Sequence, residues 1–253
     1  MDLGLKGLRV AVTGGTKGIG RAIAETFAAE GAHVAICARN AAEVEQAVAV
    51  LKAKGVNACG RALDVADGAA LRAWVDESAA ALGGLDIVVA NVSALALGGD
   101  EESWSNGFQI DLMGAVRLVN AALPMLEKSK AAAIVTISSI SGREIDFAAG
   151  PYGAMKAALI HYTQGLACTL AGKGIRANSV SPGTTYFPGG IWNQIEMNNP
   201  DFYKMALGMN PSGRMGTAQE MANATVFLAS PAASFISGTN LVVDGAFTKG
   251  VQF

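Results

Sequence analysis

The sequence has few charged and few aromatic residues, and neither sign of charge dominates. Charged residues make up 16% of the 253 residues and aromatic residues 6%, while 51% are hydrophobic. A disordered chain is poor in apolar residues and rich in charge, so this composition excludes disorder. The formal net charge of −2 leaves no basic field of the kind that attracts nucleic acid or anionic lipid. We therefore expect no nucleic-acid partner and no membrane partner.

Cysteines and long apolar runs are also scarce. The three cysteines, Cys37, Cys59 and Cys168, are too scattered for a disulfide framework, and none is spaced from another cysteine or a histidine as in a metal site. No apolar run reaches the roughly 18 residues of a membrane helix, and the first residues lack the apolar stretch of a signal peptide. These features predict a cytoplasmic protein that binds no metal.

The sequence is instead rich in an alternation of short β-branched runs and longer helical patterns. Apolar residues recur at helical spacing in between, as Ile19, Ile23 and Phe27 do before Gly31. Strands are predicted at 9–12, 33–38, 58–63, 87–90, 134–137, 176–180 and 241–243, and further helices at 41–54, 67–82, 107–126, about 151–171 and 217–228.

Strict alternation of this kind implies right-handed crossovers and a parallel sheet that helices cover on both faces. No change of composition marks a linker. The predicted fold is therefore α/β: one Rossmann-like, doubly wound domain over residues 1–253, with about seven strands.

A glycine-rich turn follows the first predicted strand and precedes the first helix. Glycine allows positive φ in a tight turn and lets a pyrophosphate approach the backbone closely, and the helix start offers unpaired N–H groups to the phosphates. At this place in an alternating chain, such a turn predicts a dinucleotide-binding site. The expected contacts come from Gly14, Thr16, Lys17, Gly18, Ile19 and Gly20.

The end of the second strand bears on which dinucleotide binds. An acidic side chain there, roughly 20 residues past the glycines, bonds the ribose 2′-hydroxyl and favours NAD. No Asp or Glu occurs from Gly31 to Ala42, and Arg39 stands at the strand end. An arginine can bind a 2′-phosphate bidentately and stack on adenine, and Lys17 adds a second positive charge. The sequence predicts NADP(H) over NAD(H), although both cations could also be ordinary solvated side chains.

A tyrosine and a lysine lie four residues apart on one face of the helix predicted from about 151, at Tyr152 and Lys156, and Ser139 lies thirteen residues before the tyrosine. Together with the glycine-rich turn and with Ser181-Pro182-Gly183 and Val243-Asp244-Gly245, they closely resemble the short-chain dehydrogenase/reductase family. The resemblance covers essentially the whole chain, with the motifs in family order and spacing. It is specific for family and cofactor type and not for substrate.

The resemblance implies a role for each of these residues. Tyr152 would give a proton to the carbonyl oxygen in reduction and remove it in oxidation. Lys156 would favour the phenolate through its charge and hold the nicotinamide ribose, and Ser139 would donate a hydrogen bond to the substrate oxygen. Further cofactor contacts are implied for Asp64, Val65, Asn91, Pro182 and Gly183.

Three departures from the family pattern lie near the predicted site. Where the family has two Asn, Ala and Gly after the fourth strand, this chain has Ala90-Asn91-Val92-Ser93. Asp111 replaces an Asn that holds a relay water. It can still hold water and is counted as catalytic, but it adds a negative charge near Lys156. The family's carboxamide-binding Thr would stand at Tyr186-Phe187, close to Thr184 and Thr185.

One long interruption of the alternation covers residues 184–216 and is rich in apolar and aromatic residues. Insertions at this place lie over the carboxyl ends of the strands, where ligands bind. An apolar lid would exclude water from hydride transfer. It predicts a hydrophobic ketone or alcohol as substrate, in a pocket lined by Phe147, Tyr186 and Trp192.

The sequence thus predicts an NADP(H)-dependent oxidoreductase that interconverts a carbonyl and a secondary alcohol, and the resemblance implies a homotetramer. One alternative is a 3-oxoacyl carrier-protein reductase of the same family. Its acidic substrate needs a basic docking patch, for which few candidates exist: Lys128, Lys130, Lys173 and Arg176. Another alternative is an idle NADP-binding sensor, against which the intact serine, tyrosine and lysine argue.

Overall fold

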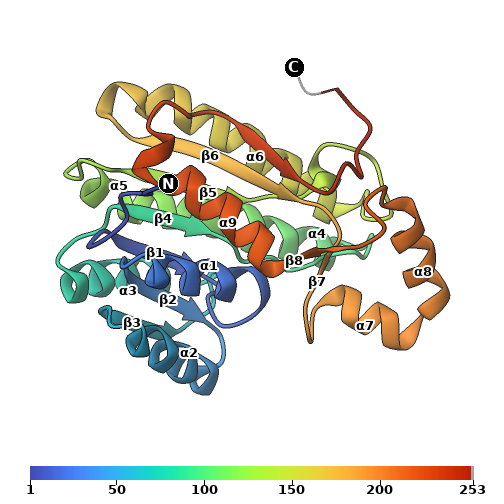
Figure 1. Ribbon diagram of the computed structural model, residues 1–253, viewed down its shortest axis with the longest axis horizontal. Helices are drawn as coiled ribbons and strands as arrows, with labels where there is room; N and C mark the ends of the chain where they lie inside the picture. Colours follow the sequence, from blue (N-terminus) through green and yellow to red (C-terminus); the bar gives the residue numbers. More distant parts are fainter. Residues whose placement is uncertain (252–253) are drawn as a thin grey trace.

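The computed structural model describes residues 1–251, and its centre is one parallel sheet of seven strands (Figure 1). The strand order is β3-β2-β1-β4-β5-β6-β9. The strands are β1 Arg9–Thr13, β2 His33–Ala38, β3 Ala58–Ala62, β4 Ile87–Ala90, β5 Ala133–Ile137, β6 Arg176–Pro182 and β9 Asn240–Val243. The predicted strands and the parallel sheet are confirmed, with strand ends that differ by no more than two residues.

The strand order changes direction at β1. The chain moves outward from β1 to β2 and β3 and then returns to place β4 on the other side of β1. Ligands of open α/β sheets bind beyond the carboxyl ends of the strands at such a point. The turn after Thr13 and the segment after Ala90 therefore flank the expected binding position.

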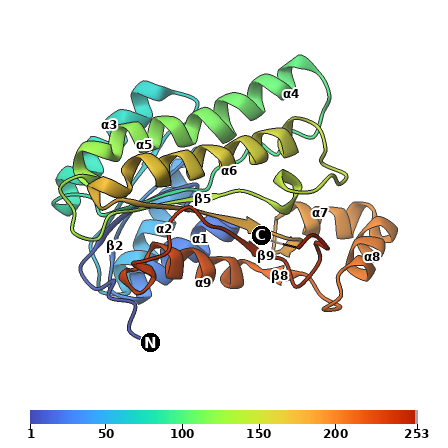
Figure 2. The same ribbon diagram turned by 90° about the horizontal axis from the view of Figure 1, so that it is seen from above.

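Helices cover both faces of the sheet, as Figure 2 shows. One face carries α1 Gly18–Ala29, α2 Ala41–Ala53 and α9 Ala218–Ala229, and the other carries α3 Gly68–Leu82, α5 Met113–Leu126 and α6 Pro151–Leu170. Short 3-10 turns are η2 Ile140–Gly142, η3 Ala171–Lys173 and η4 Pro231–Ala233. The doubly wound arrangement is confirmed.

Each face of the sheet has its own buried cluster. Val10 and Val12 of β1 pack with Phe27 on one face, whereas Ala11 packs with Trp74 on the other. Alternate residues of a strand point to opposite faces, so a strand between two helical layers is apolar throughout. This burial holds the strand ends, and the turns that follow them, in fixed positions.

The helix predicted at 107–126 is longer than expected and is not uniform. It begins as α4 Glu101–Asn106, continues as the π-helical segment η1 Gly107–Leu112 and ends as α5. Asp100 caps the start, because its Oδ1 accepts a hydrogen bond from Ser103 N at 2.8 Å. π-helical turns often occur at functional sites, and this one carries Asp111.

The interruption at 184–216 has secondary structure of its own. It contains β7 Thr185–Tyr186, α7 Ile191–Asn198, α8 Pro200–Met209 and the first residue of β8 Gly216–Thr217. β7 and β8 pair in parallel, which fastens the two ends of the segment together. In Figure 1 the two helices project beside the carboxyl end of β6.

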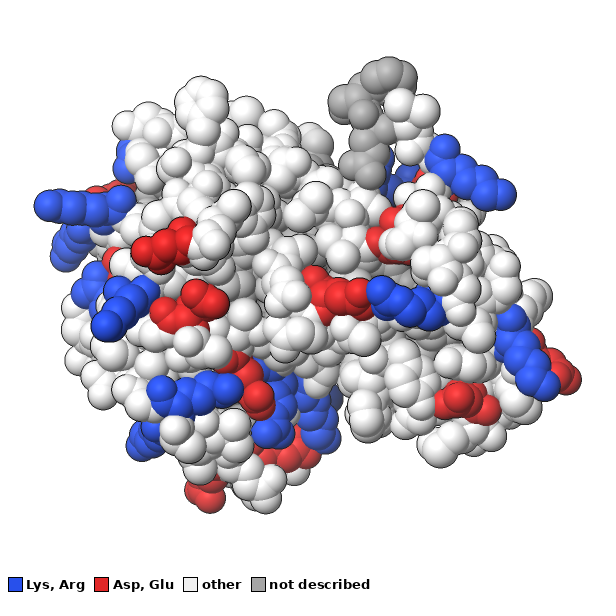
Figure 3. Space-filling model, viewed as in Figure 1, with Lys and Arg blue, Asp and Glu red and all other residues white. Residues whose placement is uncertain are grey.

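Two further observations concern the charge of the surface and the hydropathy of the helices. Lys and Arg lie among Asp and Glu on the face shown in Figure 3, with uncharged surface between them. Of the helices within residues 1–251, none is both long and apolar enough to cross a membrane.

Candidate active site

The turn after β1 brings bare backbone to the start of α1. Gly14 has φ of +70°, a conformation that side chains disfavour, and its N–H donates to Cys37 O of β2 at 2.8 Å. A Cβ at Gly20 would overlap the Gly14 carbonyl and the Asn91 amide. Only glycine fits there, and the free N–H groups of the helix start are left open to a phosphate.

Asn91 joins the glycine turn to the end of β4. Its Nδ2 donates to Thr13 O at 3.1 Å and to Gly14 O at 3.4 Å, and its backbone N–H donates to Thr13 Oγ1 at 3.0 Å. The family resemblance implies that Asn91 lies beside the adenine ribose. In the structure its amide hydrogens hold the two strand ends together, so it shapes the turn.

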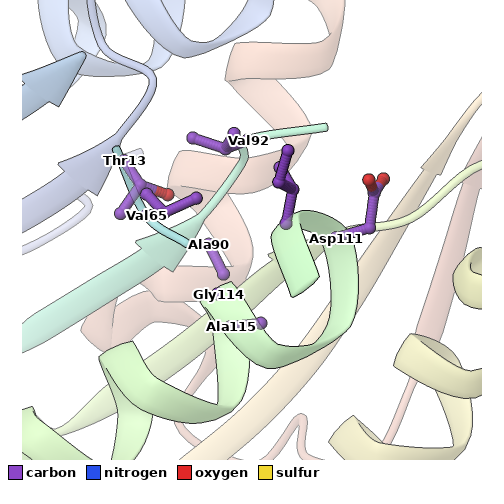
Figure 4. Close-up of a pocket in the computed structure, with 8 residues that line it drawn as sticks. Thr13, Val65, Ala90, Val92, Asp111, Gly114 and Ala115 are labelled. Carbon is purple, nitrogen blue, oxygen red and sulfur yellow. The ribbon is translucent and has the colours of Figure 1, made fainter. Parts of the chain in front are cut away.

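A cavity of about 10 Å³ lies beside these strand ends (Figure 4). A cavity this small holds about one water molecule and has no room for a nucleotide. Asp111 lies at one end of it, with its carboxylate directed away from Thr13 and Val65. Val65 is buried in the wall, whereas its neighbour Asp64 is exposed at the end of β3. The lining residues are Thr13, Val65, Ala90, Val92, Ile110, Asp111, Gly114 and Ala115.

Tyr152 and Lys156 lie in the first two turns of α6. Lys156 is 2% exposed, and its Nζ donates to Ile137 O at 3.1 Å. The same Nζ lies 5.6 Å from the centre of the Tyr152 ring, within the range of a cation–π contact. The spacing of four residues thus brings the ammonium and the phenol together at the carboxyl end of β5.

Ser139 lies two residues past the end of β5 and is also buried. Its Oγ accepts from Ser141 N at 3.1 Å and donates to Ser141 Oγ at 3.2 Å, and Ser141 Oγ donates to Asp146 Oδ2 at 2.6 Å. The preceding Ser138 donates from its Oγ to Lys156 O at 2.8 Å. These contacts hold the serine and α6 at the same strand end.

Asp111 is buried in the π-helical turn with three partners. Its Oδ1 lies 3.1 Å from Lys156 Nζ and accepts from Ser93 Oγ at 2.5 Å, and its Oδ2 accepts from Ala94 N at 2.8 Å. The two side chains of the ion pair are 1% and 2% exposed. Two departures from the family pattern therefore contact each other, since Ser93 stands where the family has Gly and Asp111 where it has Asn.

The segment after β4 links this ion pair to the start of α6. Leu95 has φ of +48°, which is unusual for a residue with a side chain. Ala96 O then accepts from Tyr152 N at 3.2 Å. Such backbone strain persists only where the surroundings fix it, and it is concentrated at active sites.

The carboxyl end of β6 offers one hydroxyl group that lacks a partner. Gly183 follows Pro182 and donates to Val243 O at 3.0 Å, and Thr185 Oγ1 donates to Gly183 O at 3.0 Å. Thr184 Oγ1 is buried without a hydrogen-bond partner among residues 1–251. A buried hydroxyl without a partner is costly. A carboxamide, which has both donors and acceptors, fits this position.

Phe187 contacts the glycine turn from the lid side. A Cβ on Gly18 would lie 2.5 Å from Phe187 Cζ, so the ring packs directly on that glycine. The sequence shows Phe187 only as a departure from the family threonine. Its contact with the turn depends on how β7 directs the chain, which a local pattern does not reveal.

Of the three residues predicted to line the substrate pocket, the structure brings two together. Phe147 packs edge-on against Trp192 and Phe202, with ring centres 5.7 Å apart in each pair. Phe202 is a member that the sequence analysis missed. These three residues, called here the aromatic cluster, join the loop before α6 to α7 and α8.

Tyr186 lies in a different group of the lid. Its ring packs on Tyr203, with centres 6.2 Å apart. Its hydroxyl donates to Glu196 Oε2 at 2.5 Å and accepts from Asn193 Nδ2 at 2.9 Å. The hydrogen bond to the Glu196 carboxylate is the main reason why the pKa of Tyr186 is raised.

The cationic residues expected at the cofactor ribose have an acidic neighbour. Arg39 is exposed at the end of β2, whereas Lys17 Nζ lies 2.7 Å from Glu43 Oε1. Glu43 lies one residue beyond the stretch from Gly31 to Ala42, which holds no acidic residue. The sequence pattern does not reveal this acidic neighbour, because it lies in the first turn of α2 and not at the end of β2.

Known proteins resemble this chain over most of its length. A family model described as Enoyl-(Acyl carrier protein) reductase matches residues 14–248. Isoepoxydon dehydrogenase patN of Penicillium expansum is 43% identical and aligns over 100% of this chain and 99% of its own. The 3-oxoacyl-[acyl-carrier-protein] reductase FabG of Escherichia coli K12 is 35% identical over 92% of this chain and 94% of its own.

A solved structure agrees over nearly the whole length. L-Sorbose reductase from Gluconobacter frateurii, complexed with NADPH and L-sorbose, superposes with a TM-score of 0.91 at 31% identity. The match covers 99% of this chain and 100% of that one.

Proposed function

The chain belongs to the short-chain dehydrogenase/reductase family, and from that membership we propose that it interconverts a ketone and a secondary alcohol with NADP(H). The family makes it a nicotinamide-dependent oxidoreductase of CH–OH or C=O groups. Its preference for NADP(H), the roles of its residues and the nature of its substrate are what we propose beyond that. The observation that carries the proposal is the buried Lys156 ammonium beside the Tyr152 ring, 5.6 Å from its centre.

The residues at the strand ends divide the work between cofactor and substrate. When bound, the nicotinamide supplies or accepts the hydride. The glycine turn would bind the pyrophosphate through its backbone, and Thr184 Oγ1 would bond the carboxamide near Pro182 and Gly183. Lys17 and Arg39 would bind the 2′-phosphate as charged donors.

Proton transfer falls to Tyr152 in this proposal. Its phenol would protonate the carbonyl oxygen during reduction and accept the proton during oxidation. Lys156 would stabilise the phenolate by its charge, and Ser139 would donate to the substrate oxygen. Asp111 would act through Lys156, because its buried carboxylate is paired with the ammonium.

The substrate that we propose is a small carbonyl compound with apolar surface. We take residues 184–216 as a lid on a single domain of residues 1–253. The aromatic cluster would cover the reacting centre from the lid side and exclude water. The relative from Penicillium expansum is named as a dehydrogenase of isoepoxydon.

The carrier-protein reductase alternative is supported by the FabG relative but not by the basic residues of this chain. Lys173 is paired with Glu127 at 2.6 Å. Arg176 donates to carbonyl oxygens that include Leu228 O and Ala229 O. Arg176 is also the first residue of β6, so it lies at the amino ends of the strands, whereas Ser139 and Tyr152 lie at the carboxyl ends. These cations would not form a docking patch at the mouth of the site.

Replacing Tyr152 by phenylalanine tests the proposal. With a panel of ketones and NADPH, Tyr152→Phe should lower kcat at least about 100-fold while the Kd for NADPH stays within about twofold, because the phosphate site is separate. Tyr162→Phe on the same helix is the matched control. The Tyr162 hydroxyl is buried without a partner among residues 1–251, and burial raises the pKa of Tyr162 to about 12.

Two results would contradict the proposal. Wild-type protein that binds NADPH but turns over no ketone or alcohol would indicate the sensor. Equal loss of cofactor binding and turnover in Tyr152→Phe would show that the residue supports the site without transferring a proton.

We also propose a homotetramer, with the cytoplasm as its location. Leu95, Leu97, Trp104 and Phe108 lie on or just before α4 and η1 and are each 42–47% exposed. Apolar side chains exposed together are a common feature of subunit contacts. Light scattering after gel filtration would give the mass of the assembly.

A further inference from the structure

An acidic side chain reaches the glycine turn from α2. Glu43 Oε1 lies 2.7 Å from Lys17 Nζ, and Glu43 Oε2 accepts a hydrogen bond from Thr16 Oγ1 at 3.4 Å. The Lys17 side chain is 73% exposed and that of Glu43 29%. The carboxylate is thus the better buried partner and has two contacts with the turn.

The start of α2 explains why Glu43 lies there. Asn40 caps the helix, its Oδ1 accepting from Glu43 N at 3.2 Å, so the Glu43 backbone is fixed close to Arg39. A Glu at this third helical position commonly bonds back to the cap residue. Here the carboxylate instead crosses to Lys17 and Thr16. The contact with the turn is therefore not a by-product of capping.

We infer that Glu43 is a specificity-determining residue that weakens the preference for NADP(H), an inference that rests on the proposed function. The two cations expected to recognise the 2′-phosphate are Lys17 and Arg39, and Glu43 neutralises one of them. A phosphate monoester carries close to two negative charges at neutral pH. It would have to share Lys17 with a carboxylate that repels it.

NAD(H) meets no such repulsion, because it has a ribose hydroxyl at this place. A carboxylate can accept a hydrogen bond from that hydroxyl. Glu43 therefore lowers affinity for NADP(H) without lowering affinity for NAD(H). The protein discriminates between the two cofactors less than its two cations alone would allow.

Glu43→Gln tests the negative charge of Glu43 separately from its contacts with Lys17 and Thr16. Glutamine keeps an oxygen that can accept from Lys17 and Thr16, and it loses only the negative charge. Screening by solvent limits the effect, so we expect about three- to tenfold tighter binding of 2′,5′-ADP. 5′-AMP, which differs from 2′,5′-ADP only in lacking the 2′-phosphate, should bind within about twofold of wild type. Calorimetric titration of both fragments at low ionic strength measures these constants without turnover.

Glu25→Gln is the matched control. Glu25 is paired with Arg21 at 2.6 Å on α1, and its side chain is 32% exposed, close to the value for Glu43. The substitution removes the same charge from a similar ion pair, but its carboxylate lies two turns into α1 and outside the residues expected to contact the cofactor. It should change neither constant, and thermal melting verifies that both variants are folded.

The possible outcomes separate this inference from the proposed function. Unchanged or weaker binding of 2′,5′-ADP in Glu43→Gln overturns the inference, and so does an equal gain in Glu25→Gln. Arg39→Ala should weaken the binding of 2′,5′-ADP and leave the binding of 5′-AMP unchanged. If wild type binds both fragments equally and Arg39→Ala changes neither, the NADP(H) proposal fails, and the inference fails with it.

Discussion

Replacing Asp111 by asparagine removes one negative charge from the buried ion pair with almost no change in side-chain size. The carboxylate forms an ion pair with Lys156 at 3.1 Å and accepts hydrogen bonds from Ser93 Oγ at 2.5 Å and Ala94 N at 2.8 Å. An amide has one oxygen, and its NH₂ group can only donate. At least one of the three donors would therefore lose its acceptor.

The expected loss follows from these contacts. A hydrogen bond to a charged group contributes about 1.5–3 kcal/mol, and a buried donor left unpaired costs a similar amount. We expect Asp111→Asn to lower the free energy of unfolding by about 2–4 kcal/mol, which lowers Tm by roughly 5–15 °C in a chain of this size. Asp111→Leu leaves the buried Lys156 without a countercharge and should cost about 3–5 kcal/mol.

The loss of activity should also be smaller in Asp111→Asn than in Asp111→Leu. In Asp111→Asn, Lys156 keeps its hydrogen bond to Ile137 O, so substantial turnover should remain. Asp111→Leu, which can bond neither Lys156 nor a water, should lose far more. Urea unfolding followed by circular dichroism gives the stability, and kcat/KM with NADPH gives the activity.

A double-mutant cycle with Ser93→Ala identifies the contact. The serine hydroxyl lies 2.5 Å from Asp111 Oδ1, so the two substitutions should couple by about 1 kcal/mol. If the two losses add without coupling, and Asp111→Asn unfolds within about 0.5 kcal/mol of wild type, the carboxylate does not hold the site together.

Two further predictions concern groups away from the site. Burial alone would raise the pKa of Asp86, but hydrogen bonds from Arg9 and Ser129 hold it below its usual value. Asp86→Ala should therefore cost about 2–3 kcal/mol at neutral pH. Protonation of Asp86 removes its ion pair with Arg9 in wild type, so the difference in unfolding free energy between the two proteins should shrink as pH falls below about 4. Guanidinium unfolding at several pH values measures this difference. A difference that stays the same in acid would contradict the role given to the Asp86 carboxylate. Burial raises the pKa of the Cys37 thiol to about 12, so a thiol reagent should label the exposed Cys168 first. Peptide mass spectrometry that finds Cys37 labelled as fast in the native protein would contradict its burial.

Much of the fold and part of the candidate site could be predicted because the signals are local. The run at 33–38 and the stop at Gly31 each depend on a few consecutive residues. Residues four apart on a helix share a face, which is why Tyr152 and Lys156 were recognisable as a pair.

Contacts between distant segments gave no such signal. Ser93 and Asp111 are separate departures in the sequence, and only the π-helical turn brings them into one hydrogen bond. Glu43 lies in the first turn of α2, beyond the end of β2 where a ribose-binding acid is expected. Tyr186 turned to Glu196 rather than to Phe147, because its direction depends on the pairing of β7 with β8.

The lid helices were missed for a different reason. α7 and α8 are 8 and 10 residues long and are separated by Asn199. Two or three turns give too few apolar repeats to establish a helical period. Pro200 begins α8, and a proline at a helix start is easily taken for a break.

The π-helical turn makes the number of residues in this segment as important as their identity. An α-helix rotates about 100° per residue, and a π turn takes in an extra residue before it closes. Deleting one residue between Gly107 and Leu112 would let α4 and α5 join as an unbroken α-helix. Asp111 would then point about 100° away from its present direction relative to Trp104. Among relatives, an aspartate at this point is therefore equivalent to Asp111 only if the spacing from α4 is also kept, and a one-residue gap there would mark a different site.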